Sequence, residues 1–379
     1  MKKLIIFFFS VVVLFGYEFK DKVFVVEREN SALAIIDKGK FVGEIKNMHN
    51  FNHAVVKFKD NDGYAITRDG YIIKFDPINN KKLKEYKTSK SAIGFVIGDD
   101  FVAVANYDDK SVDILDRDLS PIQKIKTNSR NVGIKIYKDY LVFACMDSDQ
   151  IWVMKKEVKK EPLKCIGPDG KPMYQKIVSF KKFKVFDNVG EVPFDAMIDR
   201  NLYVVGFFNS TNIGVLNLDT FEYKKVFLKV DKKNRILKVP HFGFWSISGD
   251  YFFIPAVGDK KVFVFDRKFH LVKAIEVDGN PVFTSLSPNK KYLAVTFSGK
   301  DFPKVQIVDT KDLKVLREFK FDGWILHLRW SKSQPVLYFS VNTKDRVDAY
   351  DVSKSVDEWS RVGSWKVPRP SGIFIFYKK

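Results

Sequence analysis

Histidine is rare in this chain, and the placement of its few copies is the first pointer to chemistry. Three of the 5 histidines stand at the start of short apolar segments or just inside one: His53 (NHAVV), His241 (VPHFGFW) and His327 (ILHLRW). An imidazole can bind a metal ion or transfer a proton near neutral pH. A single histidine in such a place is more often a structural residue, so the three indicate a function only if the fold brings them together.

Arginines and aromatic residues occur in segments of the same kind. Arg68 (ITRDGY), Arg130 (NSRNVG) and Arg346 (KDRVD) can each bind a carboxylate through paired, charge-assisted hydrogen bonds. Asp195 (VPFDAM) adds a carboxyl group. Four aromatic rings can form the walls of a flat site: Phe242, Phe244, Trp245 and Phe283. Together these residue types favour a pocket for an anionic tetrapyrrole over one for a sugar.

The segments that must position these residues repeat along the chain. Six apolar segments end in an aspartate that can open a tight turn: Asp37, Asp76, Asp116, Asp266, Asp309 and Asp351, with Asn217 as a variant. Repeat units begin near residues 51, 91, 131, 191, 240, 281 and 325, and each has room for about four short strands. No long helical period interrupts them. A period of this length predicts the blades of a β-propeller.

The ends of the chain supply one further blade. Residues 22–45 provide three strands without an inner one, and residues 371–377 provide one strand with nothing after it. We therefore expect an all-β, eight-bladed β-propeller closed by pairing of the N- and C-terminal strands. The loops before each innermost strand and those joining the second and third strands share one face of a propeller. The candidate residues fall in or near these loops.

Segments outside the repeat carry their own signals. Residues 1–16 contain two lysines and an apolar run, which predicts a signal peptide or N-terminal anchor, followed by a propeller over residues 17–379. Residues 155–190 hold a lysine-rich insertion, which we expect to form an extended hairpin that can contact a partner or a membrane. Cys145 lies in an apolar run and is expected to be buried. The net charge of +19 suits anionic lipids or a polycarboxylate ligand, and we expect no nucleic-acid partner.

Several other chemistries lack their motifs in this sequence. It has no glycine-rich phosphate loop, no paired-cysteine zinc motif and no G-x-S-x-G nucleophile motif. It also lacks the C-x-x-C-H motif of covalently attached haem. Acidic residues mostly occupy turns, so no pair suited to glycoside hydrolysis stands out.

Ten segments, taken in order, resemble the haem d1 propeller family, which includes the haem d1 domain of cytochrome cd1 nitrite reductase and haem d1 biosynthesis proteins. They are NHAVV, RDGYIIKFD, SRNVGI, QIWV, VPFDAM, VPHFGFW, FFIPAVG, GNPVF, ILHLRW and PSGIF. The resemblance implies a periplasmic protein, homodimeric and in some members membrane-anchored, that binds haem d1 or dihydro-haem d1. It also implies nitrite reductase or other haem d1 maturation proteins as partners. The missing C-x-x-C-H argues against the reductase itself.

The resemblance assigns roles to individual residues. His241 matches a histidine that faces the iron, so it is the candidate metal ligand. His53 and Asp195 are the candidate catalytic residues, and Arg68 and Arg130 suit the ring carboxylates. The cofactor-binding set is completed by a short list: His53, Trp245, Phe283 and His327. Gly243 and Phe244 depart from the acid and glycine of the family. Two alternatives stay open: a non-catalytic haem d1 carrier, and a propeller used only for protein contacts.

Overall fold

The computed structural model describes residues 17–52, 54–166, 172–228, 246–256 and 258–378. Within these residues the chain forms thirty-two β-strands and three 3-10 helices, η1 (Gly299–Asp301), η2 (Asn342–Lys344) and η3 (Val356–Glu358), and no α-helix. None of these described helices is long and apolar enough to cross a membrane. The expectation of an all-β fold is therefore confirmed.

The described strands form eight four-stranded sheets, named A to H here. Sheet A contains β1 (Lys22–Glu27), β2 (Ala32–Asp37), β3 (Lys40–Ile45) and β32 (Pro370–Phe376). Sheet B contains β4 (Val55–Lys59), β5 (Asp62–Ile66), β6 (Tyr71–Asp76) and β7 (Lys81–Lys87). Sheet C contains β8 (Ala92–Ile97), β9 (Val102–Asn106), β10 (Ser111–Leu115) and β11 (Pro121–Lys126). Sheet D contains β12 (Asn131–Tyr137), β13 (Tyr140–Cys145), β14 (Gln150–Ile166) and β15 (Pro172–Phe186).

The second half of the chain repeats this pattern. Sheet E contains β16 (Pro193–Asp199), β17 (Leu202–Phe207), β18 (Asn212–Asn217) and β19 (Tyr223–Phe227). Sheet F contains β20 (Ser246–Ile247), β21 (Phe252–Ala256), β22 (Lys261–Phe265) and β23 (Leu271–Glu276). Sheet G contains β24 (Asn280–Leu286), β25 (Tyr292–Ser298), β26 (Lys304–Asp309) and β27 (Lys314–Lys320). Sheet H contains β28 (Ile325–Trp330), β29 (Val336–Val341), β30 (Arg346–Asp351) and β31 (Ser360–Lys366).

The acidic residue at the end of a third strand makes the turn that the sequence predicts. Asp116 Oδ1 accepts hydrogen bonds from the backbone N–H groups of Asp118 (2.9 Å) and Ser120 (2.7 Å). Asp266 Oδ1 does the same for Lys268 and His270, at 2.8 Å each. The side chain thus satisfies backbone donors that the turn leaves without a strand partner.

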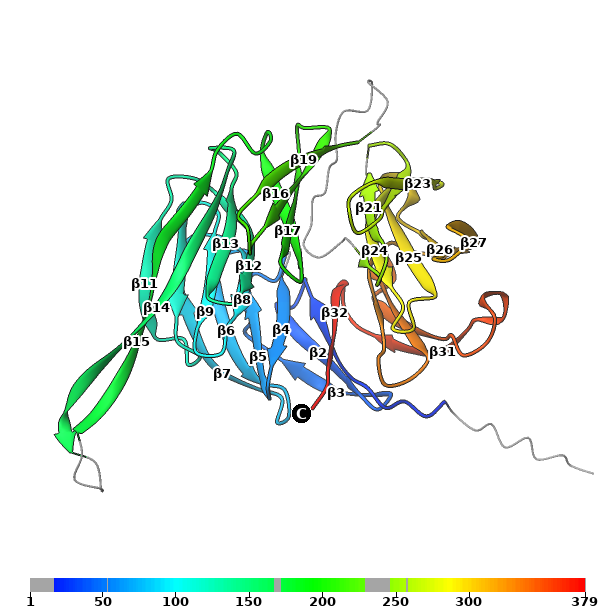
Figure 1. The fold of residues 1–379 in the computed structure, drawn as a ribbon. Coiled ribbons are helices and arrows are strands. Elements are labelled where there is room, and N and C mark those ends of the chain that lie inside the picture. Colours follow the sequence, from blue (N-terminus) through cyan, green and yellow to red (C-terminus); the bar gives the residue numbers. More distant parts are fainter. Residues whose placement is uncertain (1–16, 53, 167–171, 229–245, 257, 379) are drawn as a thin grey trace, which may run out of the picture.

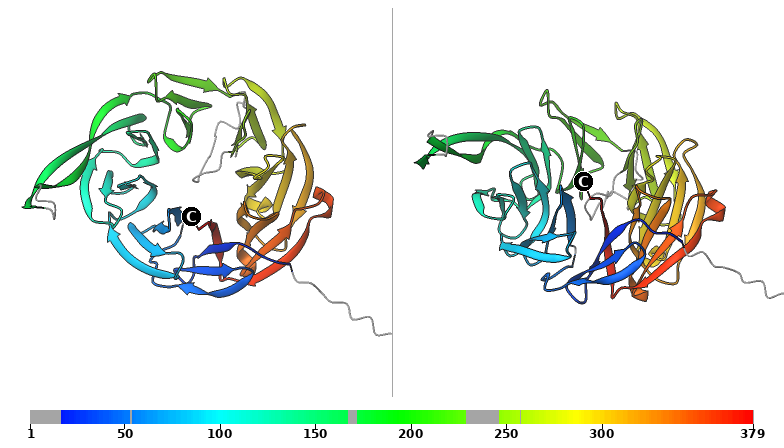
Figure 2. Two further views of the ribbon diagram at one scale, coloured as in Figure 1. Left: turned by 60° about the horizontal axis from the view of Figure 1, so that its bottom comes forward. Right: turned by 90° about the horizontal axis from the view of Figure 1, so that it is seen from below.

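The sheets stand around a central space and are consistent with a β-propeller (Figure 2). The buried apolar residues form eight clusters, one for each pair of neighbouring sheets in the order A to H and back to A. Phe24 of sheet A and Phe75 of sheet B, both fully buried, share one such cluster, and their ring centroids are 5.5 Å apart. Burial between sheets, rather than in one central core, therefore stabilises the fold.

The two ends of the chain pair with each other. β32 runs antiparallel to β1, with Phe24 opposite Phe374 and Val25 opposite Ile373. This is the pairing that the sequence predicts from the unpartnered segments at each end. β32 also contacts β28 of sheet H and β4 of sheet B, so it lies between its neighbours on both sides.

The lysine-rich insertion forms the hairpin β14–β15, which extends away from the sheets (Figure 1). The part of the hairpin nearer the sheets packs on sheet C. Phe180, in β15, is buried, and its ring lies 4.9 Å from that of Phe101. The Phe180 N–H donates to Gln123 Oε1 (2.8 Å). Further out, Val158 and Tyr174 are 50% and 59% exposed. Cys145, in β13, is buried as expected and carries a free thiol.

Candidate functional site

Arg68 lies in the turn between β5 and β6, whose conformation depends on the sequence TRDG. The Thr67 hydroxyl donates to Asp69 Oδ1 (2.7 Å). Gly70 has a φ of +86°, and any side chain there would collide with the Ser89 carbonyl oxygen. Glycine is therefore required, and the tight turn holds the half-buried Arg68 at the rim of sheet B.

Arg130 lies just before β12 and is oriented by two neighbours. Asp147, in the turn between β13 and β14, accepts hydrogen bonds from the backbone N–H (2.9 Å) and from Nε (2.7 Å) of Arg130. Arg130 Nη1 donates to the hydroxyl of Tyr107 (2.9 Å), a residue in the turn between β9 and β10. These contacts fix the guanidinium before any ligand arrives.

The ring of Tyr107 joins the two arginines. The guanidinium carbons of Arg68 and Arg130 lie 5.6 and 5.1 Å from its centroid. We call Arg68, Tyr107 and Arg130 the rim cluster; its members come from loops of sheets B, C and D. Among the described residues, the side chain of Arg68 has no hydrogen-bond partner for its five N–H donors, whereas Arg130 uses three of its own. The arrangement suits an incoming carboxylate.

His327, in β28, lies among aromatic rings. Its centroid is 5.5 Å from that of Phe283 and 5.8 Å from that of Phe374. The Ile373 N–H donates to His327 Nδ1 (3.2 Å), and burial holds the pKa of His327 well below its usual value. The neutral ring therefore carries its proton on Nε2. His327 can donate a hydrogen bond from Nε2, and that nitrogen could bind iron only by losing its proton.

Asp195, in β16, is only 2% exposed and accepts a hydrogen bond from the Ala196 N–H (2.7 Å). Burial lowers the pKa of Lys57, in β4, and of Lys135, in β12, and the negative charge of Asp195 raises both pKa values again in part. The carboxyl group thus lies close to two lysines on other sheets. A carboxylate in such surroundings can hold a proton in transfer or balance a cation.

Three of the predicted residues, His53, His241 and Trp245, lie outside the described residues. Phe242 and Phe244 do so as well. The third arginine considered from the sequence, Arg346, is engaged elsewhere. Its Nη1 donates to Asp322 Oδ2 and its Nε donates to Asp348 Oδ2, each at 2.9 Å. Arg346 therefore has a structural role in sheet H.

Sequence analysis missed four residues beside the candidate site. Tyr107 was overlooked because the turn ANYDDK reads as an ordinary polar loop. Arg28 follows β1 as Arg68 follows β5, and its buried Nε has no hydrogen-bond partner among the described residues. This equivalent position was the signal that could have identified it. Lys57 and Lys135 alternate with apolar residues, which is the pattern of a strand face in contact with solvent.

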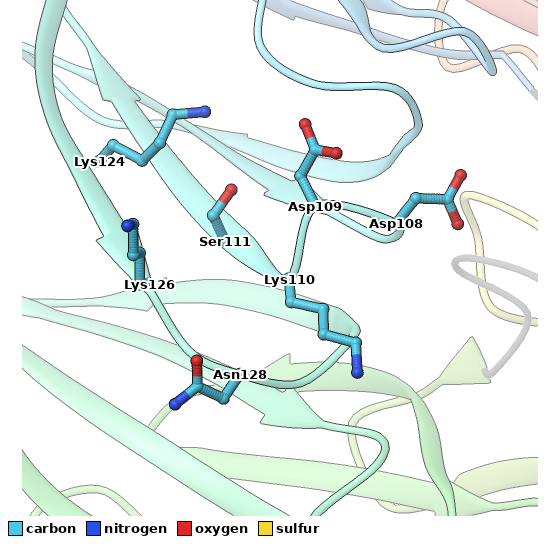
Figure 3. A pocket seen from close by; sticks show the side chains of 7 residues that line it. All are labelled: Asp108, Asp109, Lys110, Ser111, Lys124, Lys126 and Asn128. Atoms are coloured by element: carbon cyan, nitrogen blue, oxygen red, sulfur yellow. The ribbon is translucent and has the colours of Figure 1, made fainter.

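A separate surface pocket of about 390 Å³ lies beside sheet C (Figure 3). Its lining mixes acidic and basic side chains from the turn after β9 and from β10 and β11: Asp108, Asp109, Lys110, Ser111, Lys124, Lys126 and Asn128. Most of them are exposed and offer no apolar wall. The pocket is therefore a poor site for a flat, largely apolar ligand.

A polycarboxylate macrocycle fits the described side chains. The Arg68 donors and the buried Arg28 Nε have no partner among the described residues and call for acceptors, and Phe283 and Phe374 supply ring faces. Among the described residues, no group of three or more His, Cys, Asp or Glu could hold a bare metal ion. A metal would thus have to arrive already bound to its macrocycle or be held by residues outside this set.

Comparison with known proteins gives consistent results. Residues 17–379 match the family described as Cytochrome D1 heme domain. Two similar relatives are both called Protein NirF. The one from Pseudomonas aeruginosa is 27% identical, covering 93% of this chain and 90% of its own. The one from Stutzerimonas stutzeri is 24% identical, covering 86% and 85%.

Solved structures share the fold. Dihydro-heme d1 dehydrogenase NirN, in a complex with DHE, superposes with a TM-score of 0.76 at 20% identity, covering 94% of this chain and 76% of NirN. AztD from Citrobacter koseri in its apo form superposes with a TM-score of 0.62 at 13% identity, covering 94% and 97%. At these identities the two structures support the architecture alone.

Proposed function

The chain belongs to the Cytochrome D1 heme domain family, and we propose that it is a haem d1 biosynthesis protein that binds haem d1 or dihydro-haem d1. The observation that carries this proposal is the rim cluster, in which Arg68 and Arg130 meet over Tyr107 with hydrogen-bond donors still available. The relatives called NirF and the fold shared with NirN, solved with DHE, support it.

In this proposal each residue has one task. Arg68 and Arg130 bind ring carboxylates, and Phe283 and Trp245 lie against the macrocycle. His327 donates from Nε2 to an acceptor on the ligand, since its Nδ1 is already occupied. His241 is the candidate iron ligand. His53 and Asp195 hold and transfer a proton.

The bound macrocycle would supply the redox-active ring and its iron. The protein would bind it, orient it and exclude water. Asp195 is suited to proton transfer because burial of the carboxyl keeps bulk water away from it. A non-catalytic carrier remains the second candidate, since the described residues used for binding need perform no chemistry. A propeller used only for protein contacts is a third.

The deciding experiment is an absorption titration of the purified protein with haem d1 and with dihydro-haem d1. We expect saturable binding, and His241→Ala should alter the Soret and long-wavelength bands. Arg68→Ala should weaken affinity and leave the iron bands largely unchanged. If neither tetrapyrrole binds, the protein-contact candidate is favoured and this proposal fails.

Conversion of the bound tetrapyrrole precursor distinguishes a maturation enzyme from a carrier. His53→Ala should bind the ligand but abolish cofactor production in a denitrifying host that lacks the native gene. Full nitrite respiration with both His53→Ala and His241→Ala would instead support a carrier that needs neither group.

We further propose where and how the protein works. Residues 1–16 would direct export to the periplasm and could tether the chain to the membrane, while residues 17–379 form a closed, eight-bladed propeller. Homodimerisation and contact with nitrite reductase or other haem d1 maturation proteins complete the proposal. The basic hairpin β14–β15 is the candidate contact surface for such a partner or for a membrane. Fractionation with a periplasmic marker tests the location.

A further inference from the structure

Two lysines occupy equivalent places on innermost strands of different sheets. Lys57, in β4, lies opposite Tyr64 of β5, and Lys135, in β12, lies opposite Val142 of β13. Tyr64 and Val142 stand at the same height in their sheets. Each lies four residues before the residue, Arg68 or Met146, whose backbone N–H donates to a carbonyl oxygen in the loop before the innermost strand. Both lysines are half-buried, so water still reaches them. Lysine is seldom found inside a protein unless it has a partner or a task.

The partners of the two lysines differ. Lys57 Nζ donates to the Phe95 carbonyl oxygen (2.5 Å) and lies 4.9 Å from the centroid of the Phe95 ring. Lys135 makes no hydrogen bond and no ion pair with any described residue. Lys57 therefore has a structural role in part, because it bridges sheets B and C. The ammonium group of Lys135, in contrast, has no partner among the described residues.

The charges around the two lysines are unbalanced. Burial lowers the pKa of Lys57 to about 7, and the positive charge of Lys135 lowers it further. Burial also lowers the pKa of Lys135, and Asp195 opposes the shift at both residues. Within the part of the chain that the structure describes, the two lysines thus share the influence of one carboxylate, that of Asp195. A second negative charge would stabilise both ammonium groups.

We propose that Lys57 and Lys135 form a second anion site, deeper than the rim cluster, that binds a carboxylate of the tetrapyrrole. This inference rests on the proposed function. Lysine suits the place because its compact ammonium group is a point charge with three N–H donors. The rim cluster and the lysine pair would then hold carboxylates on different edges of one macrocycle and so fix its orientation.

The test compares two lysine variants with matched controls from the same strands or their ends. Lys57→Met and Lys135→Met keep side-chain length and remove the charge. Lys59→Met and Lys138→Met are the controls, because their ammonium groups already pair with the exposed Asp99 (2.5 Å) and with Asp219 (2.7 Å). We expect Lys135→Met to weaken haem d1 binding about 10-fold or more and the controls to change it less than about 2-fold. Circular dichroism checks that each variant is folded.

Two further measurements sharpen the test. The methyl ester of haem d1, whose carboxylates are capped, should bind wild type and Lys135→Met with equal affinity, since the interaction that the variant removes is absent. Nuclear magnetic resonance of ¹³C-dimethylated protein should show the Lys57 and Lys135 signals titrating at higher pH once haem d1 is bound. If wild type binds haem d1 but Lys135→Met matches Lys138→Met and neither lysine titration moves, the anion site is wrong and the proposed function stands. If wild type does not bind haem d1, both fail.

Discussion

Arg68 and Arg130 differ in how much of each guanidinium is left for a ligand. Arg130 is held by Asp147 and Tyr107, whereas Arg68 only stacks near the Tyr107 ring. We therefore expect Arg68→Ala to weaken haem d1 binding about 10- to 100-fold, as for loss of charge-assisted hydrogen bonds. Absorption titration measures it. Arg361→Ala, at an exposed position of sheet H, is the control, and equal affinities for the two variants would contradict the role of the rim cluster.

Tyr107→Phe tests orientation apart from charge. The change removes the hydroxyl that accepts from Arg130 Nη1 and leaves the ring beneath both guanidinium groups. The expected loss of affinity is smaller, about 3- to 10-fold, since Arg130 loses one hydrogen bond but is still held by Asp147. The same titration measures it. A loss as large as that of Arg68→Ala would mean that Tyr107 itself contacts the ligand.

Glu27 makes stability depend on pH in an unusual direction. This carboxyl group, at the end of β1, is fully buried, and burial raises its pKa to about 7. Between its ordinary pKa of 4.5 and about 7 the folded state binds more protons than the unfolded state, so raising the pH destabilises the fold. We expect the free energy of unfolding to fall by about 2–3 kcal/mol from pH 5 to pH 8 through this group.

Urea denaturation at several pH values measures this dependence. Glu27→Gln should remove most of it and be more stable than wild type at pH 8. Glu29→Gln, at the exposed neighbouring position, should leave the dependence unchanged. An unchanged pH dependence in Glu27→Gln would show that the pKa of this carboxyl is not raised in the folded protein.

Individual site residues could be predicted where their position in the repeat was informative. Arg68 lies in the loop between a second and a third strand, and Arg130 lies in the loop before an innermost strand. Both kinds of loop share one face of a propeller, so the repeat predicted that these two residues lie on one face. Lys57, Lys135 and Tyr107 could not be identified in this way. Their significance comes from neighbours on other sheets, such as the influence of Asp195 on both lysines, and no local pattern records those contacts.

The base of the hairpin β14–β15 has one face packed on sheet C and one face that is more exposed, and the alternation of residues along β15 separates the two. Phe180 is buried against Phe101, whereas Phe183 is 47% exposed. Phe180→Ala should lower the free energy of unfolding by about 3–5 kcal/mol, because it leaves a cavity between sheets C and D. Phe183→Ala should cost less than half of that. Chemical denaturation measures both, and equal effects would contradict the packing of the hairpin on sheet C.

The strands themselves were predictable because the turn chemistry is local. An aspartate that bonds N–H groups two to four residues ahead needs no distant partner, so Asp116 and Asp266 marked strand ends from sequence alone. The insertion was recognisable as a break in the period. How far its base would pack on sheet C was not, since this depends on Gln123 and Phe101 of another repeat unit.

The whole molecule depends on the last strand. Every neighbouring pair of sheets shares an apolar cluster, and the cluster between sheets H and A includes Ile373 of β32. Ile373 is fully buried, its N–H donates to His327 and its carbonyl accepts from Arg329 Nε (3.0 Å). The sequence period predicts that such a strand must return to β1. It cannot predict that the same strand also bonds the candidate site residue His327 and the neighbouring Arg329 of sheet H.

Loss of this strand should therefore affect stability and the site together. Ile373→Ala should lower the free energy of unfolding by about 2–5 kcal/mol. Deletion of residues 371–379 should prevent cooperative folding, because it exposes the edge of β1 and removes the contacts of β32 with sheets H and B. Deletion of residues 378–379 alone, beyond β32, is the control and should be neutral. Thermal and chemical denaturation measure all three, and a truncated protein that melts like wild type would disprove closure of the ring by its two ends.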